Sequence, residues 1–416
     1  MLAGFARRAI NPEYPTDLAG FDLRKADSTG VLDDIFAAAL ALVSDAGQRW
    51  LLLSFDLLGV TRALCERLKK LLSKRLSIEE DRIWAVATHT HAAPRAAMMR
   101  RESDEAYVSR LLSGALDAAG EALHNLSHVT ASFGKSAACG IASYRDVPRE
   151  RSAYAMPLLK LIFENPTSRL GLVRMQCHPT VLNESNLLVS KDLAGVWEED
   201  GADSDLLLAN GACGDLSTRY TRQGAGPAEL KRMRELLLKA IQNTSVQPLP
   251  GFGRRIRSAS TLVRVESSQP LSLQEKRALI QTHEERLAEI KDEAAKRELI
   301  SIIAVLKRDP KPREDSRDVA LAAVDFESMM LFAMPFEIDS AEGEAMEEEL
   351  SRRAGKRAFI LCYAGGYEGY LPSGKPIGPD SNYQDVAASL APGAKQTVMN
   401  AAIQLINTIS EENSHE

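Results

Sequence analysis

The sequence predicts an α/β fold, in which mixed β-sheets are flanked by helices within one composite domain spanning residues 1–416. Apolar stretches of strand length alternate with longer segments that repeat their apolar residues every three or four positions, and this alternation is typical of α/β architectures. No low-complexity linker and no short-period repeat interrupts the chain. With 416 residues, 45% of them hydrophobic, the chain can fill a large core.

The first third of the chain predicts a hairpin, a helix, a strand and a second helix. Two apolar runs within residues 35–60 surround the turn-prone "DAGQ", which favours a β-hairpin. Residues 61–76 have helical spacing, whereas residues 81–91, "DRIWAVATHTH", predict a buried strand. A further helix is expected over about residues 104–124.

The rest of the chain repeats this alternation. Strand-like runs follow at residues 156–163, 168–179, 204–215, 317–337 and 356–370. Pro227 opens an amphipathic helix whose apolar stripe consists of Leu230, Met233, Leu237 and Ile241. The C-terminal helix carries a similar stripe, made of Val398, Ala402, Leu405 and Ile409.

A charged segment, about residues 270–310, differs in composition and predicts a helical insertion. It is rich in Glu, Lys, Ala and Leu from Ser272 to Lys307, and Ser272 and Glu275 have the spacing of a capping box. One long helix or a helical hairpin is expected. Its charges indicate a solvated face, and a lid or a dimer contact are the alternatives. Homo-oligomerisation is therefore one of the possible roles of this segment.

Charge and composition exclude some classes of protein. A net charge of -6 and a pI near 5.8 give no basic surface for nucleic acid. The N-terminus lacks a signal-peptide core and no stretch approaches a membrane span, so we expect a soluble, cytoplasmic protein. Five scattered cysteines without CxxC spacing indicate reduced thiols.

Polar residues follow the apolar runs again and again, and this recurrence indicates a site. They are Asp56, His89, His91, His178, Asp215, Glu337 and Tyr370. Sites in α/β proteins collect where strand ends meet loops. On an extended backbone, His89 and His91 would point to the same face and could hold a metal such as zinc. Hydrogen-bonded structural histidines are the alternative for this pair, and a core histidine is the alternative for His178.

Two loops carry other candidate residues. Asn186 and Asp192 are typical turn or capping residues. The glycine-rich "ANGACGDLSTRYTRQGAG" has no Walker spacing, so we expect it to carry Asp215 and Ser217 into a pocket. Two arginines in this loop, Arg219 and Arg222, are available there for an anionic group. No GxSxG elbow surrounds Ser217, so a serine hydrolase is the weaker alternative.

Taken in order, these motifs resemble the catalytic domain of the neutral ceramidase family, zinc-dependent amidases that cleave the N-acyl bond of ceramide. "ATHTHAAP" resembles the family's THTHSGP, and "CHPTVLNESNLLVSKDLAG" its second histidine segment. "NGACGDLSTRY", "MPFE", "YEGYLPSG" and "GFARRAINPEYP" resemble further family segments, so the likeness spans nearly the whole chain. It is closest to short bacterial members, because no C-terminal immunoglobulin-like domain follows residue 416.

The resemblance implies a Zn²⁺ cofactor and a role for each motif residue. The implied zinc ligands are His89, His178, Glu337 and Tyr370. The implied catalytic residues are His91 at the substrate carbonyl or attacking water, Arg145 of "SYRD" facing the substrate, Tyr383 of "NYQD" at the oxyanion, and Glu337 as proton carrier. Asp192 or Asp215 would orient imidazole N–H groups. The implied substrate is a small-molecule or lipid-like amide.

Departures from the family pattern keep other functions open. Ala92 and Ala93 replace a Ser-Gly pair, and Phe336 replaces a glycine, so we expect an altered pocket lining. The substrate could be another amide or an ester. A non-catalytic relative that binds a ligand is a second hypothesis, and an assembly protein that uses residues 272–307 as a partner surface is a third.

Overall fold

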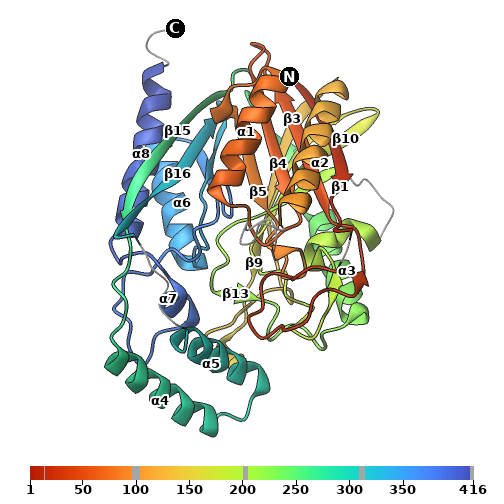
Figure 1. The fold of residues 1–416 in the computed structure, drawn as a ribbon. Helices are drawn as coiled ribbons and strands as arrows, with labels where there is room; N and C mark the ends of the chain where they lie inside the picture. Colours follow the sequence, from red (N-terminus) through yellow and green to blue (C-terminus); the bar gives the residue numbers. More distant parts are fainter. Residues whose placement is uncertain (14, 96–103, 200–204, 309–313, 413–416) are drawn as a thin grey trace.

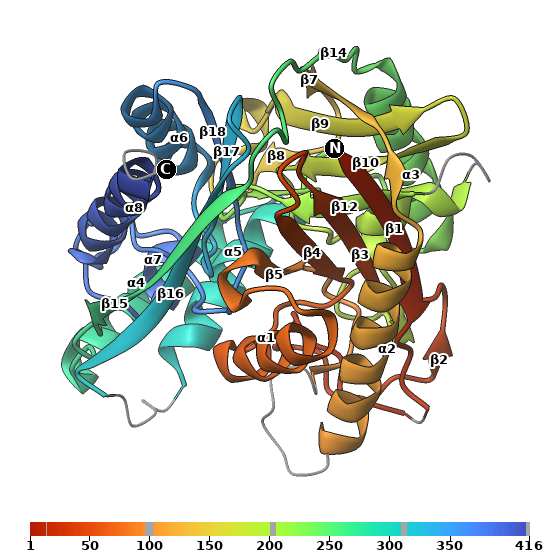
Figure 2. The ribbon, with the colours of Figure 1, turned by 90° about the horizontal axis from the view of Figure 1, so that it is seen from above.

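The computed structural model describes the whole chain except residues 14, 96–103, 200–204, 309–313 and 413–416. Three mixed sheets and their helices form the α/β architecture that the sequence predicts (Figures 1 and 2). Two two-stranded sheets join the loops, β2 (Gly30–Val31) with β11 (Leu188–Val189), and β8 (Ser143–Tyr144) with β13 (Leu216–Ser217). No helix in the described part of the chain is long and apolar enough to cross a membrane.

The first sheet has the strand order β5-β4-β3-β1-β6. Its strands are β1 (Leu2–Ala9), β3 (Phe36–Val43), β4 (Arg49–Phe55), β5 (Ile83–Ala87) and β6 (Ser127–His128). Along β3, alternate side chains face opposite ways: the small Ala37, Ala39 and Ala41 pack with the helices, whereas Leu40 and Leu42 face the central core. The helices on this face are α1 (Arg62–Leu76) and α2 (Glu105–His124) (Figure 2).

The second sheet has the order β12-β10-β9-β7-β14. Its strands are β7 (Thr130–Ala138), β9 (Met156–Asn165), β10 (Ser168–Met175), β12 (Leu206–Asn210) and β14 (Gln247–Pro248). Strands β9 and β10 form an antiparallel hairpin, and β12 adds to β10 in parallel. The amphipathic helix predicted to start at Pro227 is α3 (Pro227–Asn243), which packs against the 3₁₀ segment η5 (Asp192–Glu199).

The third sheet has the order β15-β16-β17-β18. Its strands are β15 (Arg257–Glu266), β16 (Ser316–Asp325), β17 (Met329–Ala333) and β18 (Arg357–Leu361), with α6 (Ser340–Ala354) and α8 (Ala394–Glu412) packed on them and α7 (Tyr383–Ala387) nearby. The three sheets share one apolar core, in which Trp50 contacts Trp84 and Phe326 edge to face at 5.6 and 5.2 Å between ring centroids.

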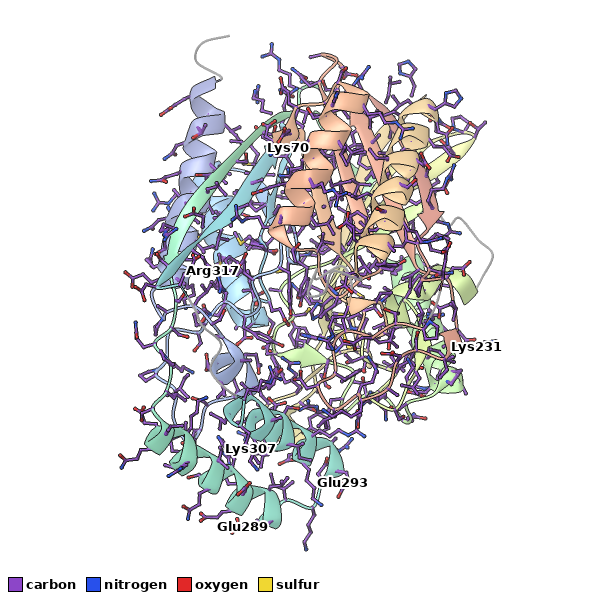
Figure 3. All side chains as sticks on the ribbon, in the orientation of Figure 1. Lys70, Lys231, Glu289, Glu293, Lys307 and Arg317 are labelled. Atoms are coloured by element: carbon purple, nitrogen blue, oxygen red, sulfur yellow. The ribbon has the colours of Figure 1, made fainter. Side chains whose placement is uncertain are left out.

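The predicted insertion is a helical hairpin, α4 (Leu273–Glu289) and α5 (Glu293–Leu306), that lies apart from the sheets (Figure 1). The predicted capping box is present, because the Ser272 hydroxyl accepts the Glu275 N–H and the Glu275 carboxylate accepts the Ser272 N–H. Glu289 and Glu293 mark the outer end of the hairpin (Figure 3). The last two predicted residues, 309 and 310, lie outside the described residues.

The hairpin is inserted between two adjacent strands. Glu266, the last residue of β15, pairs directly with Ser316, the first residue of β16, and the next N–H, of Ser267, donates to the Asp315 carbonyl at 2.9 Å. The chain therefore leaves and re-enters the third sheet at one place. The hairpin is held against α7 by a small apolar cluster, in which its residues pack with Val386 of α7; the hairpin residues are Leu279, Leu299, Ile302 and Leu306.

Candidate metal centre

Side chains from three separate loops converge on one buried point. His89 follows β5, His178 follows β10, and Glu337 follows β17. The His178 Nε2 atom lies 3.0 Å from Glu337 Oε2, and His89 Nε2 lies 3.4 Å from the same oxygen. His91 Nε2 is 3.4 Å from His89 Nε2. His89, His178 and Glu337 are only 1–2% exposed.

His89 does not lie on a strand, so the expected extended geometry is wrong. Strand β5 ends at Ala87, and His89 has a left-handed backbone with φ of 67°. The His89 ring stacks on Tyr363 at 4.0 Å and its Nδ1–H donates to the Leu58 carbonyl at 2.7 Å. That bond fixes the ring with Nε2 facing the site, 3.4 Å from Glu337 Oε2. A left-handed non-glycine residue is costly and is often part of a functional site.

The glycine-rich loop fixes His178. The His178 Nδ1 atom lies 2.9 Å from the carbonyl oxygens of Cys213 and of Leu216. The backbone N–H of His178 also donates to the Leu216 carbonyl, at 3.1 Å. The carboxylate of Asp192 accepts the N–H groups of Val181 and Leu182, which shapes the loop after His178. Backbone carbonyls therefore orient the two imidazoles, rather than the acids that the resemblance implies.

Of the other predicted loop residues, Ser217 lines the pocket, whereas Asp215 and Asn186 are not in the described lining. Asp215 accepts the N–H and the hydroxyl of Ser340, and its own carbonyl accepts the Arg145 N–H at 3.0 Å. Asn186 bonds Leu188 in a turn, whereas Ser217 lines the pocket. The sequence departs from the family pattern at Ala92, Ala93 and Phe336, which are buried and are not in the described pocket lining. The expectation that these three residues alter the pocket lining is therefore wrong.

Glu337 stays ionised in spite of its burial. Burial by itself would raise its pKa, but the charge of His89 and the hydrogen bond to His178 outweigh burial and hold the pKa well below its ordinary value. Its Oε1 atom accepts the Tyr367 hydroxyl at 2.5 Å. Sequence reasoning missed Tyr367, and the only signal for it was its place three residues before Tyr370.

Burial also favours the neutral form of two neighbouring imidazoles, those of His178 and His91. Burial, followed by the charge of Arg145, lowers the pKa of His178 to about 4. Burial and the nearby His89 hold the pKa of His91 well below its ordinary value. Neutral nitrogens beside an ionised carboxylate are the protonation states that a zinc ion requires.

Arg145, Tyr370 and Tyr383 lie together on one side of the site. The Arg145 Nη2 donates to the Tyr370 hydroxyl at 2.6 Å, and its guanidinium lies 5.4 Å from the Tyr383 ring centroid. Tyr370 is next to Glu337 through a backbone bridge. Burial raises the pKa of Tyr370 well above its ordinary value, although Arg145 opposes this. Its hydroxyl is thus engaged by Arg145.

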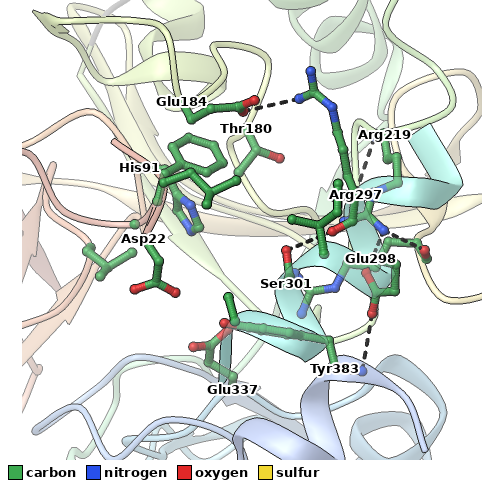
Figure 4. Close-up of a pocket in the computed structure, with 18 of the residues that line it drawn as sticks. Asp22, His91, Thr180, Glu184, Arg219, Arg297, Glu298, Ser301, Glu337 and Tyr383 are labelled. Carbon is green, nitrogen blue, oxygen red and sulfur yellow. Dashed lines mark hydrogen bonds and ion pairs between the residues drawn. The ribbon is translucent and has the colours of Figure 1, made fainter. Parts of the chain in front are cut away.

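These residues open into one pocket of about 370 Å³ (Figure 4). One wall of it, here called the α5 wall, is a face of α5 made of Glu293, Lys296, Arg297, Glu298, Ile300, Ser301 and Ala304. Sequence reasoning took this segment for a solvated face. The missed signal is that these residues repeat at intervals of three and four, which places them on one side of a helix.

The donor set fits a zinc ion. One nitrogen from each of His89, His91 and His178 lies within 4.8 Å of the other two, so this group could bind a metal. Ligand atoms at about 2.0–2.1 Å from a tetrahedral zinc lie about 3.3–3.4 Å from one another. The separations of 3.0 and 3.4 Å between the imidazole nitrogens and Glu337 Oε2 are close to that value.

Comparison with known proteins identifies the fold. No protein-family model and no curated protein matches the chain. Two solved structures are similar over 99% of this chain, both with a TM-score of 0.76. The neutral ceramidase from Pseudomonas aeruginosa is 14% identical and 74% of its chain is covered, and a ceramidase complexed with C2 is 12% identical with 75% covered. The predicted resemblance is confirmed at the level of the fold: this chain has the fold of neutral ceramidase.

Proposed function

We propose that the protein is a zinc-dependent hydrolase, an amidase that cleaves an N-acyl bond. The convergence of His89, His178 and Glu337 at 3.0–3.4 Å carries the proposal, because this arrangement has little other reason to be buried. The fold, shared with structures of neutral ceramidase, supports it. We assign His89, His178, Glu337 and Tyr370 as the residues that hold the ion.

A zinc ion in such a site acts as a Lewis acid and lowers the pKa of a bound water toward neutrality, to about 7. The chain's own residues then position the substrate and move protons. Arg145 and Tyr383 lie on the side of the site where they can donate to the oxygen of a polarised carbonyl.

We assign the proton transfer to His91 in place of Glu337. Both oxygens of Glu337 are engaged, Oε1 by the Tyr367 hydroxyl and Oε2 by two imidazoles. His91 lines the pocket, is neutral, and has no partner for its Nδ1 atom among the described residues. It can accept a proton from water and return it to the leaving amine.

The deciding experiment combines metal analysis with a substrate screen. About one zinc per chain is expected, lost in His89→Ala and kept in His91→Ala, because His91 is assigned to proton transfer. The zinc-loaded protein is tested on N-acyl amines, N-acyl amino acids, esters and ceramides, with Tyr370→Phe as a control that should be impaired. A protein without zinc, or with zinc and no turnover of any of these compounds, would instead be a ligand-binding relative.

A further inference from the structure

Besides Arg145, four basic side chains line the pocket. They are Arg219, Arg222, Lys296 and Arg297. Three of them have acidic partners. Arg219 pairs with Glu298 at 2.5 Å and Arg297 with Glu184 at 3.2 Å (Figure 4). Lys296 pairs with Glu293 at 2.6 Å.

Arg222 is the exception. Its Nη1 donates to the carbonyl oxygens of Thr180 and Val181, at 2.5 and 3.0 Å, and within the described ranges no carboxylate lies at ion-pair distance from it. Burial lowers its pKa, and the neighbouring guanidinium of Arg297 lowers it further. A guanidinium nevertheless remains charged at any physiological pH. Arg222 is therefore a half-buried cation with unused donors.

Arg222 is tied to the loop that carries His178. Thr180, which it holds, is two residues after His178, and the Thr180 N–H donates to the His178 carbonyl at 2.9 Å. A volume of about 370 Å³ is near the lower end of the range of ligand pockets, about 300–1,000 Å³. A compact polar substrate suits such a pocket better than a lipid with two long chains.

We propose that the substrate is a compact N-acyl amine that carries an anionic oxygen group, a carboxylate or a phosphate, which Arg222 binds. This inference rests on the proposed amidase function and specifies its substrate class. The planar guanidinium suits both anions, because it can donate two parallel hydrogen bonds to either of them.

The test uses three compounds with the same acyl chain: N-hexanoylglycine, N-hexanoyl-O-phosphoethanolamine and the neutral N-hexanoylglycinamide. The zinc-loaded protein is expected to favour one anionic compound over the neutral one by about tenfold or more in kcat/KM, mostly through KM. Whichever anion is favoured identifies the group. Equal or better hydrolysis of the neutral compound would overturn the inference.

Variants assign the preference to Arg222. Arg222→Gln should lower the anionic-to-neutral ratio to about threefold or less, and Arg222→Lys should keep part of it, because lysine retains the charge without the fork. Arg264→Gln, at an exposed site on β15, is the matched control and should keep the full ratio. An unchanged ratio in Arg222→Gln contradicts the inference. An unchanged zinc content shows that the loop after His178 is intact.

A binding experiment separates this inference from the amidase proposal. Calorimetry with metal-free protein should show N-hexanoylglycine or N-hexanoyl-O-phosphoethanolamine binding about tenfold more tightly than the neutral N-hexanoylglycinamide. This difference in affinity should be lost in Arg222→Gln. If no compound is cleaved, the amidase proposal fails while this binding result still decides the role of Arg222. Equal binding of all three compounds rules that role out.

Discussion

The two sides of the pocket are built in different ways. The floor consists of the pocket-lining His89 and Glu337 together with His178, which contacts Glu337, and all three are 1–2% exposed. Backbone carbonyls of the core loops hold its two imidazoles. The α5 wall belongs to a hairpin that packs on α7 through a small apolar cluster separate from the common core, and most of the wall's residues are partly exposed.

This difference indicates a division of tasks. The floor depends on loops from all three sheets, so a change there disturbs groups that are expensive to leave buried and unpaired. The α5 wall touches the same cavity from outside the common core, so its side chains can change at little cost to the fold. We therefore expect floor variants to affect metal and stability, and wall variants to affect substrate selection.

The largest effect is expected at the floor. Glu337→Ala removes the carboxylate that lies near both imidazoles, so zinc should fall well below about one per chain and hydrolysis should fall by about 10³-fold or more. Metal analysis and kinetics measure this. Glu344→Ala, at an exposed position on α6, is the matched control and should behave as wild type. Full zinc content in Glu337→Ala would show that the floor does not hold the metal.

The floor should also make the metal-free protein sensitive to acid. The pKa of His178 is about 4 when folded against 6.5 for a free histidine, so below pH 6.5 the unfolded chain takes up a proton that the folded chain does not. This contribution to stability is complete above pH 6.5 and is lost as the pH falls toward 4, by about 3 kcal/mol at most.

Urea unfolding of the metal-free protein at pH 7.5 and pH 5 measures that loss. His178→Gln should lose less stability between the two pH values than wild type. His124→Gln, at an exposed site on α2, should lose as much as wild type. The same loss in His178→Gln and wild type would assign the acid sensitivity to another group.

A smaller effect is expected behind the floor. Tyr367→Phe removes the hydroxyl that donates to Glu337 Oε1, and losing such a supporting bond weakens metal binding by about 10–100-fold. Competition with a zinc chelator measures the affinity. Tyr154→Phe, which removes a bond to Gln176 away from the pocket lining, is the control. An unchanged affinity in Tyr367→Phe would mean that the imidazoles hold Glu337 in place without help.

The α5 wall should respond in the opposite way. Ala304→Trp fills part of the cavity from a half-buried position, so kcat/KM should fall by about tenfold or more, while zinc content and thermal stability stay close to wild type. Ala304→Ser is the conservative control. Loss of zinc in Ala304→Trp would mean that the wall and the floor are one structural unit.

The sequence predicts much of the fold because its signals are local. The apolar spacing after Pro227 and the capping box at Ser272 depend on residues a few positions apart, and both predicted helices are present. The position of polar residues at the ends of apolar runs also led to His178 and Glu337, which the structure brings within 3.0 Å of each other.

What the sequence could not predict depends on distant contacts. His89 takes a left-handed backbone because its N–H and ring bond the carbonyls of Leu57 and Leu58, which are about thirty residues away. Lys296 and Arg297 look like ordinary surface charges until the hairpin is placed over the pocket. Hydrophobic periodicity carries no information about such placement.

The insertion point of the hairpin has a consequence for how this protein could evolve. Because Glu266 and Ser316 are paired neighbours, a segment of almost any length between them can be exchanged, shortened or duplicated while the ladder on either side keeps its register. Relatives of this chain could in this way acquire a different pocket wall by replacing a single segment, while the buried His89, His178 and Glu337 stay in place.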